Sequence, residues 1–440
     1  MEEEGNRRHS RKKTKVVVAL WGFQMGWFEV GEFRICMWWW GLGEVGKGSV
    51  LPYNNSSLRS LLVFGKSSKE LGVGKQQGIL EIAIVFKKLN LLRVLDITEI
   101  KTYDGIMPKE IGNLIHLRYL RIRSTNIREL PKSIGKLCKL LTFDYRDILG
   151  DSEIILPDIF WKLEKLKYLF LPTKKMCNTI SNLKLDTLKE LQTLWGVKAG
   201  DWMFKEMATL SKSLTKLHIQ AISSEEQFNA VIQCPAIRNL YALVLDWYGF
   251  SSLDCIDKLC SNEEIQIKKL RLLGRAPDLF KPLKFPSNLW KLELYYTHLK
   301  EEKTMNALGM LPHLKFLRLA KDSFLGSKWT CKENTFTSLE ELILSNLPYL
   351  ENWMMESKTM ECLKKLSIIS CTRLQRLPEK LQLITNLEGI KIQYMPTSFC
   401  SRLRRNQSSN KTSQGGEDIK IVQHVPNLTI DNSYTSIPLP

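Results

Sequence analysis

Residues 41–47, Gly-Leu-Gly-Glu-Val-Gly-Lys, have the spacing of a loop that binds nucleotide phosphates. In such loops Gly41 and Gly46 would free the backbone N–H groups to surround a phosphate, and Lys47 would reach its outer oxygens. Gly48, however, stands where a Ser or Thr hydroxyl should hold magnesium. Because apolar repeats begin soon afterwards, no room remains for a nucleotide-binding α/β domain. We interpret the motif as a chance match or a vestige and expect no cofactor; a working ATP site is the alternative.

Catalytic and metal-binding spacings do not stand out elsewhere. The six histidines include no His-Glu-x-x-His pair, and no Gly-x-Ser-x-Gly elbow is present, so no enzyme is predicted. None of the ten cysteines forms a Cys-x-x-Cys pair. They stand singly where a repeat would place a small apolar residue, as at Cys138 and Cys371. This usage favours a reduced, intracellular protein without disulfides or structural metal.

The chain is strongly basic, with 64 Lys and Arg against 46 Asp and Glu, or 64 − 46 = +18. Such a charge raises the question of nucleic acid or of an acidic protein surface as partner. Acidic residues such as Asp144, Asp246 and Glu293 interrupt the basic positions of the strands that the spacing predicts. Protein is therefore the predicted partner, and single-stranded nucleic acid the weaker alternative.

One apolar spacing organises most of the sequence. Leu117, Leu120 and Ile122 change from a separation of three to a separation of two, which predicts a turn followed by a short strand with alternate residues buried. The first strand position recurs at Leu95, Leu120, Phe143, Leu169, Leu194, Leu217, Leu243, Leu270, Leu292, Leu317, Leu342, Leu366 and Ile390. These thirteen positions give a mean period of (390 − 95)/12, about 24.6 residues.

Such a period is typical of leucine-rich repeats. It predicts an α/β leucine-rich-repeat solenoid, a horseshoe with a concave parallel β-sheet and an irregular helical or loop convex side. The predicted parts are an atypical N-terminal extension (1–50), a capping segment (51–94), about thirteen repeats (95–400) and a flexible tail with a capping strand (401–440).

The extension 1–50 leaves several interpretations open. The apolar run Val16 to Phe28 is too short to span a bilayer and is followed at once by Glu29, so no integral membrane segment is expected. The run has the charge order of a secretion signal but no cleavage pattern. A disordered or buried extension, or a mis-joined coding segment, are the other interpretations.

Positions between the strand leucines should face the concave side. Aromatic and arginine side chains are frequent there, and these types dominate protein-binding hot spots, although some would only keep the face soluble or contact neighbouring strands. The predicted partner-binding residues are Arg121, Arg123, Trp195, His218, Trp247, Arg271, Tyr295 and Arg318.

Two consecutive repeats resemble a known family. Residues 107–120 (Met-Pro-Lys-Glu-Ile-Gly-Asn-Leu-Ile-His-Leu-Arg-Tyr-Leu) and 125–137 are similar to the repeat region of plant intracellular disease-resistance proteins of the coiled-coil, nucleotide-binding, leucine-rich-repeat class. Residues 59–64 resemble the way those repeat regions begin, and 416–418 and 422–426 the way they finish.

The resemblance covers about residues 57 to 430 and implies a role in plant innate immunity. The implied partners are a pathogen effector or an effector-modified host protein, and the nucleotide-binding domain of a resistance protein, which the repeats would restrain. The implied location is the cytoplasm, or the periphery of the plasma membrane. The sequence shows no counterpart of the family's coiled coil, nucleotide switch or Met-His-Asp signature, so nucleotide-driven signalling is not expected of this chain. A non-immune scaffold that binds a small GTPase or a phosphatase is the alternative.

Overall fold

The structure is a computed structural model, and it describes residues 59–64, 83, 86–87, 89–99, 102, 104–150, 153–173, 183–210, 212–249, 258–259, 262, 264–276, 285–286, 288–300, 302–403, 416 and 418–431, with the backbone of 16–19, 27–30 and 33–36. The phosphate-loop match at 41–47 and most of the predicted extension lie outside these residues. The chain divides into two compact units: unit 1 is 1–197 with 209–211, and unit 2 is 198–208 with 212–440.

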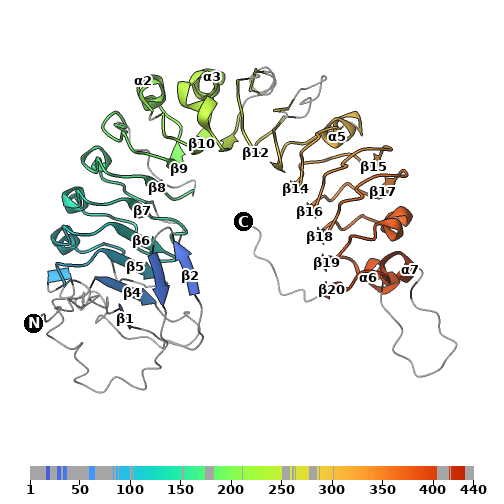
Figure 1. The fold of residues 1–440 in the computed structure, drawn as a ribbon, viewed down its shortest axis with the longest axis horizontal. Coiled ribbons are helices and arrows are strands. Elements are labelled where there is room, and N and C mark those ends of the chain that lie inside the picture. The colour runs from blue at the N-terminus through green and yellow to red at the C-terminus, as the bar shows by residue number, and fades with distance from the viewer. Residues whose placement is uncertain are drawn as a thin grey trace, which may run out of the picture. The chain divides into compact units, whose positions relative to one another are not determined.

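Unit 1 contains a parallel ladder of short strands in chain order (Figure 1). Its members are β4 (Ser60–Phe64), β5 (Val94–Thr98), β6 (Tyr119–Arg123), β7 (Thr142–Asp144), β8 (Tyr168–Phe170) and β9 (Thr193–Lys198). β1 (Val16–Ala19) pairs in parallel with β4, and β2 (Trp27–Val30) pairs antiparallel with β3 (Phe33–Cys36). The 3-10 helices η1 (Lys109–Asn113), η2 (Lys132–Lys136) and η3 (Phe160–Lys162) lie on one face of this ladder.

Unit 2 has the same construction. Its parallel strands are β10 (Lys216–Ile222), β11 (Ala242–Trp247), β12 (Lys269–Leu273), β13 (Lys291–Tyr295), β14 (Phe316–Ala320), β16 (Glu341–Ser345), β18 (Lys365–Ile369), β19 (Gly389–Gln393) and β20 (Asn427–Asp431). Its helices are α2 (Trp202–Glu206), α3 (Glu225–Gln233), η5 (Pro235–Asn239), α5 (Glu302–Gly309), η6 (Glu379–Leu383), α6 (Thr397–Leu403) and α7 (Ile419–Val422). η4 (Met207–Thr209) follows α2.

The predicted leucine positions stand opposite one another along each ladder. In unit 1, Leu95, Leu120, Phe143, Leu169 and Leu194 are successive partners. In unit 2 the series runs Leu217, Leu243, Leu270, Leu292, Leu317, Leu342, Leu366 and Ile390. All thirteen side chains are buried. One repeat cannot bury its own apolar edge, so these stacked side chains are the core, and the predicted fold class is confirmed.

A left-handed residue follows many of the strands. Ser124, Lys321, Asn346 and Ser370 come directly after β6, β14, β16 and β18, with φ between 51° and 53°. This conformation turns the chain away from the ladder and costs non-glycine residues free energy. The connections then differ in length and helix type, which is the irregular outer side that the uneven spacing predicted.

Unit 2 also carries a second, two-stranded parallel sheet on its helical side, β15 (Lys328–Cys331) with β17 (Asn352–Met355). The rings of Trp329 and Trp353 stack there at 5.4 Å with an interplanar angle of 9°. The sequence analysis did not predict this sheet. Of the two cysteines expected at apolar positions, Cys371 is buried, whereas Cys138 is exposed, which corrects its predicted place.

Candidate protein-binding surface

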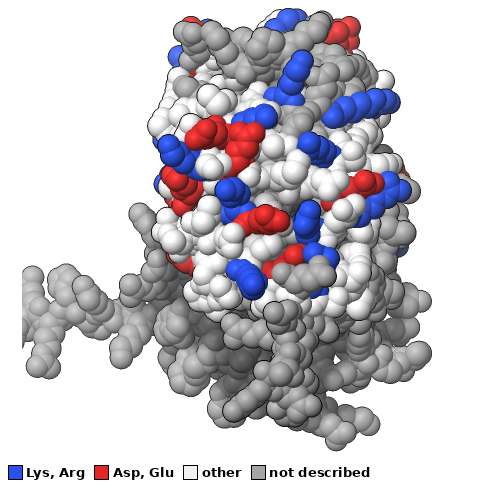
Figure 2. All heavy atoms as spheres, turned by 90° about the vertical axis from the view of Figure 1, so that its right-hand side faces the viewer, with Lys and Arg blue, Asp and Glu red and all other residues white. Residues whose placement is uncertain are grey.

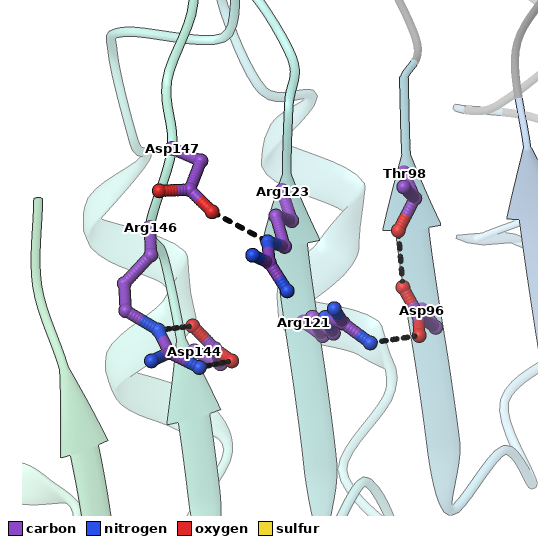
Figure 3. Close-up of polar contacts among 7 residues, drawn as sticks. All are labelled: Asp96, Thr98, Arg121, Arg123, Asp144, Arg146 and Asp147. Carbon is purple, nitrogen blue, oxygen red and sulfur yellow. Dashed lines mark hydrogen bonds and ion pairs between the residues drawn. The ribbon is translucent and has the colours of Figure 1, made fainter. Parts of the chain in front are cut away.

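The strand face opposite the described helices, here called the open face, carries a row of alternating charges in unit 1. Asp96, Arg121 and Asp144 are successive partners across β5, β6 and β7. The guanidinium of Arg121 lies 3.3 Å from the Asp96 carboxylate, and Arg146 donates two hydrogen bonds of 2.8 and 2.7 Å to Asp144 (Figure 3). The charges of this row are therefore largely neutralised within the chain.

Burial changes the pKa values of side chains in and beside this row. It raises the pKa of the Asp96 carboxyl above its ordinary value, an effect that the nearby Arg121 charge only partly opposes. Burial likewise raises the pKa of Tyr119 to about 12. The pKa of Arg146 is raised, chiefly by its hydrogen bonds to Asp144. Arg121 thus links β6 to β5, whereas Arg146 is bound to Asp144 within its own repeat.

Two predicted binding residues of unit 1, Arg123 and Trp195, differ in how readily a partner could contact them. Arg123 donates from Nε to the Asp147 carboxylate at 2.5 Å, and both side chains are exposed, so a partner can compete for this arginine at small cost (Figure 3). Trp195 is half-buried and stands opposite Phe170, over whose ring the guanidinium of Arg146 lies at 4.3 Å. Sequence analysis missed Arg146, although its spacing of two from Asp144 was the available signal.

The open face of unit 2 has a buried acid at its centre. Glu293 of β13 stands between Arg271 of β12 and Arg318 of β14, and its side chain is 2% exposed. It accepts a hydrogen bond from Nε of Arg271, pairs with Nη2 of the same guanidinium, and forms an ion pair of 2.8 Å with Lys291. Burial alone would raise the pKa of Glu293, but these two partners together lower it below its ordinary value. The carboxylate is thus ionised and held in place by two cations.

Tyr295 joins the two arginines of this face. Its hydroxyl accepts a hydrogen bond of 3.1 Å from Nη1 of Arg318, and its ring lies 5.6 Å from the guanidinium carbon of Arg271. The ring is only half-buried. The structure therefore brings three predicted site residues, Arg271, Tyr295 and Arg318, into one patch, with Lys291 as a member that sequence analysis did not name.

Two other predicted binding residues of unit 2, Trp247 and His218, are buried. Trp247 is 2% exposed, because the inward alternation of Leu243 and Leu245 continues through it; its indole packs edge-on against Phe228 at 5.8 Å. Its placement on the open face was wrong. His218 does alternate to that face but is also buried. Burial, with the Arg271 charge as a smaller cause, lowers its pKa to about 3, so the ring is neutral at physiological pH.

The outer side of the last repeats also carries charges of both signs. Figure 2 shows Lys and Arg interspersed with Asp and Glu there. Lys332 and Glu356, for example, form an ion pair of 3.0 Å. Within the described part of the chain, no group of three His, Cys, Asp or Glu side chains is placed to hold a metal ion, and no helix has the length and apolarity to cross a membrane.

Parallel strands stacked at one buried leucine position per turn, with a broad open face, define a leucine-rich-repeat solenoid, which is a protein-interaction fold. Residues 58–397 match the family described as "Leucine-rich repeat region", and the chain belongs to this family.

Its repeat region is homologous to that of plant disease-resistance proteins, as the resemblance implied. Disease resistance protein RPP8 of Arabidopsis thaliana is 33% identical over 354 residues, which cover 80% of this chain and 37% of the relative. Probable disease resistance RPP8-like protein 4 of the same plant is 30% identical over 383 residues, covering 86% and 39%. The chain thus spans less than two fifths of the length of these relatives. A solved leucine-rich-repeat protein of Leptospira interrogans has a TM-score of 0.43 at 20% identity, covering 86% of this chain and 90% of that chain.

Proposed function

We propose that this chain is a protein-recognition module of plant innate immunity, whose open face binds a pathogen effector or a host protein that the effector has modified. The observation that carries the proposal is the match of its repeats to disease-resistance proteins over 80% of the chain. The open-face residues support it, since half-exposed Trp195 and Tyr295 offer large contact area at low entropic cost.

The proposal gives the module no chemistry of its own. It acts as a binding protein, since an extended open face of this kind suits docking. In a longer resistance protein, the lysine- and arginine-rich strands of unit 2 would restrain a nucleotide-binding domain by electrostatic complementarity. Its place of action is the cytoplasm, or the cytoplasmic side of the plasma membrane.

The test is a binding assay of the full chain against a panel of purified pathogen effectors and their host targets, together with a non-immune small GTPase and a phosphatase. The face variant is Trp195→Ala with Tyr295→Ala, which removes two half-buried rings. The matched control is Tyr349→Ala with Met354→Ala, which removes two exposed apolar side chains of unit 2 that are not on the open face. We expect one protein of the panel to bind wild type and control and to bind the face variant at least tenfold more weakly, a difference of about 1.4 kcal/mol. Equal binding by both variants, or binding of only a non-immune GTPase or phosphatase, would overturn the proposal.

A further inference from the structure

A row of alternating aromatic and lysine residues lies just before strands β11 to β14 of unit 2. Backbone hydrogen bonds continue the ladder through it, from Lys268 N–H to the Tyr241 carbonyl (3.1 Å), from Trp290 to Lys268 (3.0 Å) and from Lys315 to Trp290 (2.8 Å). These side chains surround an open hollow of about 520 Å³. Its lining consists of Tyr241, Lys268, Asn288, Trp290, His313 and Lys315.

The strands beside this hollow have a surplus of positive charge. The stretches 241–246, 268–273, 290–295 and 315–320 contain six Lys or Arg residues and two acids, Asp246 and Glu293, so their net charge is 6 − 2 = +4. Glu293 is already bound by Arg271 and Lys291, and Lys315 pairs at 2.8 Å with Glu340 of the next repeat. Within the described part of the chain, no ion pair involves Lys268 or Lys269.

Aromatic rings contact two half-buried lysines of these strands; Lys291 also pairs with Glu293, whereas Lys269 has ring contacts and, among the described residues, no acid partner. The ammonium of Lys269 lies 5.0 Å from the centre of the Tyr241 ring and 4.8 Å from that of Trp290. Lys291 lies 4.0 Å from the centre of the Phe316 ring. Cation–π contacts orient a lysine without neutralising it. A carboxylate arriving from outside would therefore meet charges that are already positioned, which lowers the entropic cost of binding.

We propose that this row binds an acidic segment of a partner protein, with its carboxylates on Lys268 and Lys269 and one apolar side chain in the hollow beside Tyr241 and Trp290. The inference rests on the proposed protein-binding function and names the chemistry of the partner. Single-stranded RNA fits less well, because Lys269 occupies the position between the two rings where a base would stack.

The test measures fluorescence anisotropy with the full chain and three labelled probes. One is a nine-residue peptide of eight Asp and Glu around a central Phe, the second replaces that Phe by Ala, and the third is an oligouridine of equal charge. The row variant is Lys268→Glu with Lys269→Glu. The control, Lys328→Glu with Lys358→Glu, makes the same charge change at two exposed positions outside the row, one of them in the outer strand β15 (Figure 1).

We expect the row variant to bind the Phe peptide roughly tenfold more weakly than wild type, and the control to change its affinity less than about twofold. Trp290→Ala should weaken the Phe peptide more than the Ala peptide, because it removes a wall of the hollow as well as one of the two rings that position Lys269. Equal losses in row variant and control would mean nonspecific attraction and would overturn the proposal, as would tighter binding of oligouridine than of either peptide.

The two proposals fail separately. Suppose that an effector or host protein binds through the open face, but that Lys268→Glu with Lys269→Glu changes neither its affinity nor that of the acidic peptide. The acidic-segment inference is then wrong, while the proposed protein recognition stands. If the peptide binds as expected and no protein of the immune panel binds at all, recognition in immunity is wrong and the row remains an acidic-peptide site.

Discussion

Replacing Arg271 by Met tests whether the buried carboxylate of Glu293 depends on its ion pairs. The substitution keeps most of the apolar stem and removes the guanidinium, so Glu293, 2% exposed, would retain only Lys291. Leaving a buried charge without any partner costs about 3–5 kcal/mol. Because Lys291 remains, we expect Arg271→Met to lower the free energy of unfolding by about 2–3 kcal/mol.

A double-mutant cycle separates the ion pair from the rest of the side chain. Removing both charges, in Arg271→Met with Glu293→Leu, should bring the loss to within about 1 kcal/mol of wild type, because nothing charged is then left buried. The assay is urea unfolding at neutral pH, followed by circular dichroism and by tryptophan fluorescence, since a repeat array need not unfold in one step.

The same cycle has a pH signature. The folded pKa of Glu293 is lowered, so the ion pair stabilises the fold fully above the ordinary Glu pKa of about 4.3 and loses this effect as the pH falls through the folded pKa. The coupling between Arg271 and Glu293 should therefore shrink in acid. A cost of Arg271→Met below about 0.5 kcal/mol, additive losses in the double variant, or a coupling independent of pH would show that Glu293 does not depend on Arg271.

Four further predictions concern stability and ligand binding. Gly274→Ala should lower the free energy of unfolding in urea by about 2–4 kcal/mol, because the added Cβ would lie 2.5 Å from the Trp247 ring and the φ of residue 274 is +152°. Trp247→Ala should lower the same free energy by about 3–5 kcal/mol, because it leaves a cavity in the core. Asp96→Asn should keep or raise the urea midpoint at neutral pH, because the raised folded pKa means that the ionised carboxylate, despite Arg121, destabilises the fold as the pH rises through that pKa. Magnesium-ATP should not raise the melting temperature, and Lys47→Ala should leave the melting curve with ATP unchanged; an ATP-induced rise that Lys47→Ala abolishes would restore the phosphate-loop hypothesis.

The strand ladder could be predicted from the sequence because its signal repeats. Each of the thirteen leucine positions is weak evidence, but their common spacing leaves one architecture, and the core needs only apolar side chains at that spacing. Trp247 was predicted to bind a partner, but it is buried in line with Leu243 and Leu245 of β11. Trp247 was assigned to the open face because the spacing of the shorter strands was applied to β11, which is longer.

The partners of the charged residues could not be predicted in the same way. Whether Arg121 meets Asp96, or Arg271 meets Glu293, depends on the register between strands about 25 residues apart, and the spacing varies from repeat to repeat. The outer sheet of β15 and β17 was missed for a related reason, since its four-residue strands lie in connections without the leucine period.

An arginine on an open sheet face is therefore not by itself a binding anchor. Arg146 and Arg271 each already pair with a carboxylate of the chain, and binding a partner would require breaking that ion pair. For Arg271 the carboxylate is buried. Lys268 and Lys269 give up no acid within the described part of the chain, so a partner's carboxylate adds its full interaction there. The positions that bind partners are thus better sought among cations held by aromatic rings than among the arginines of the charge ladders.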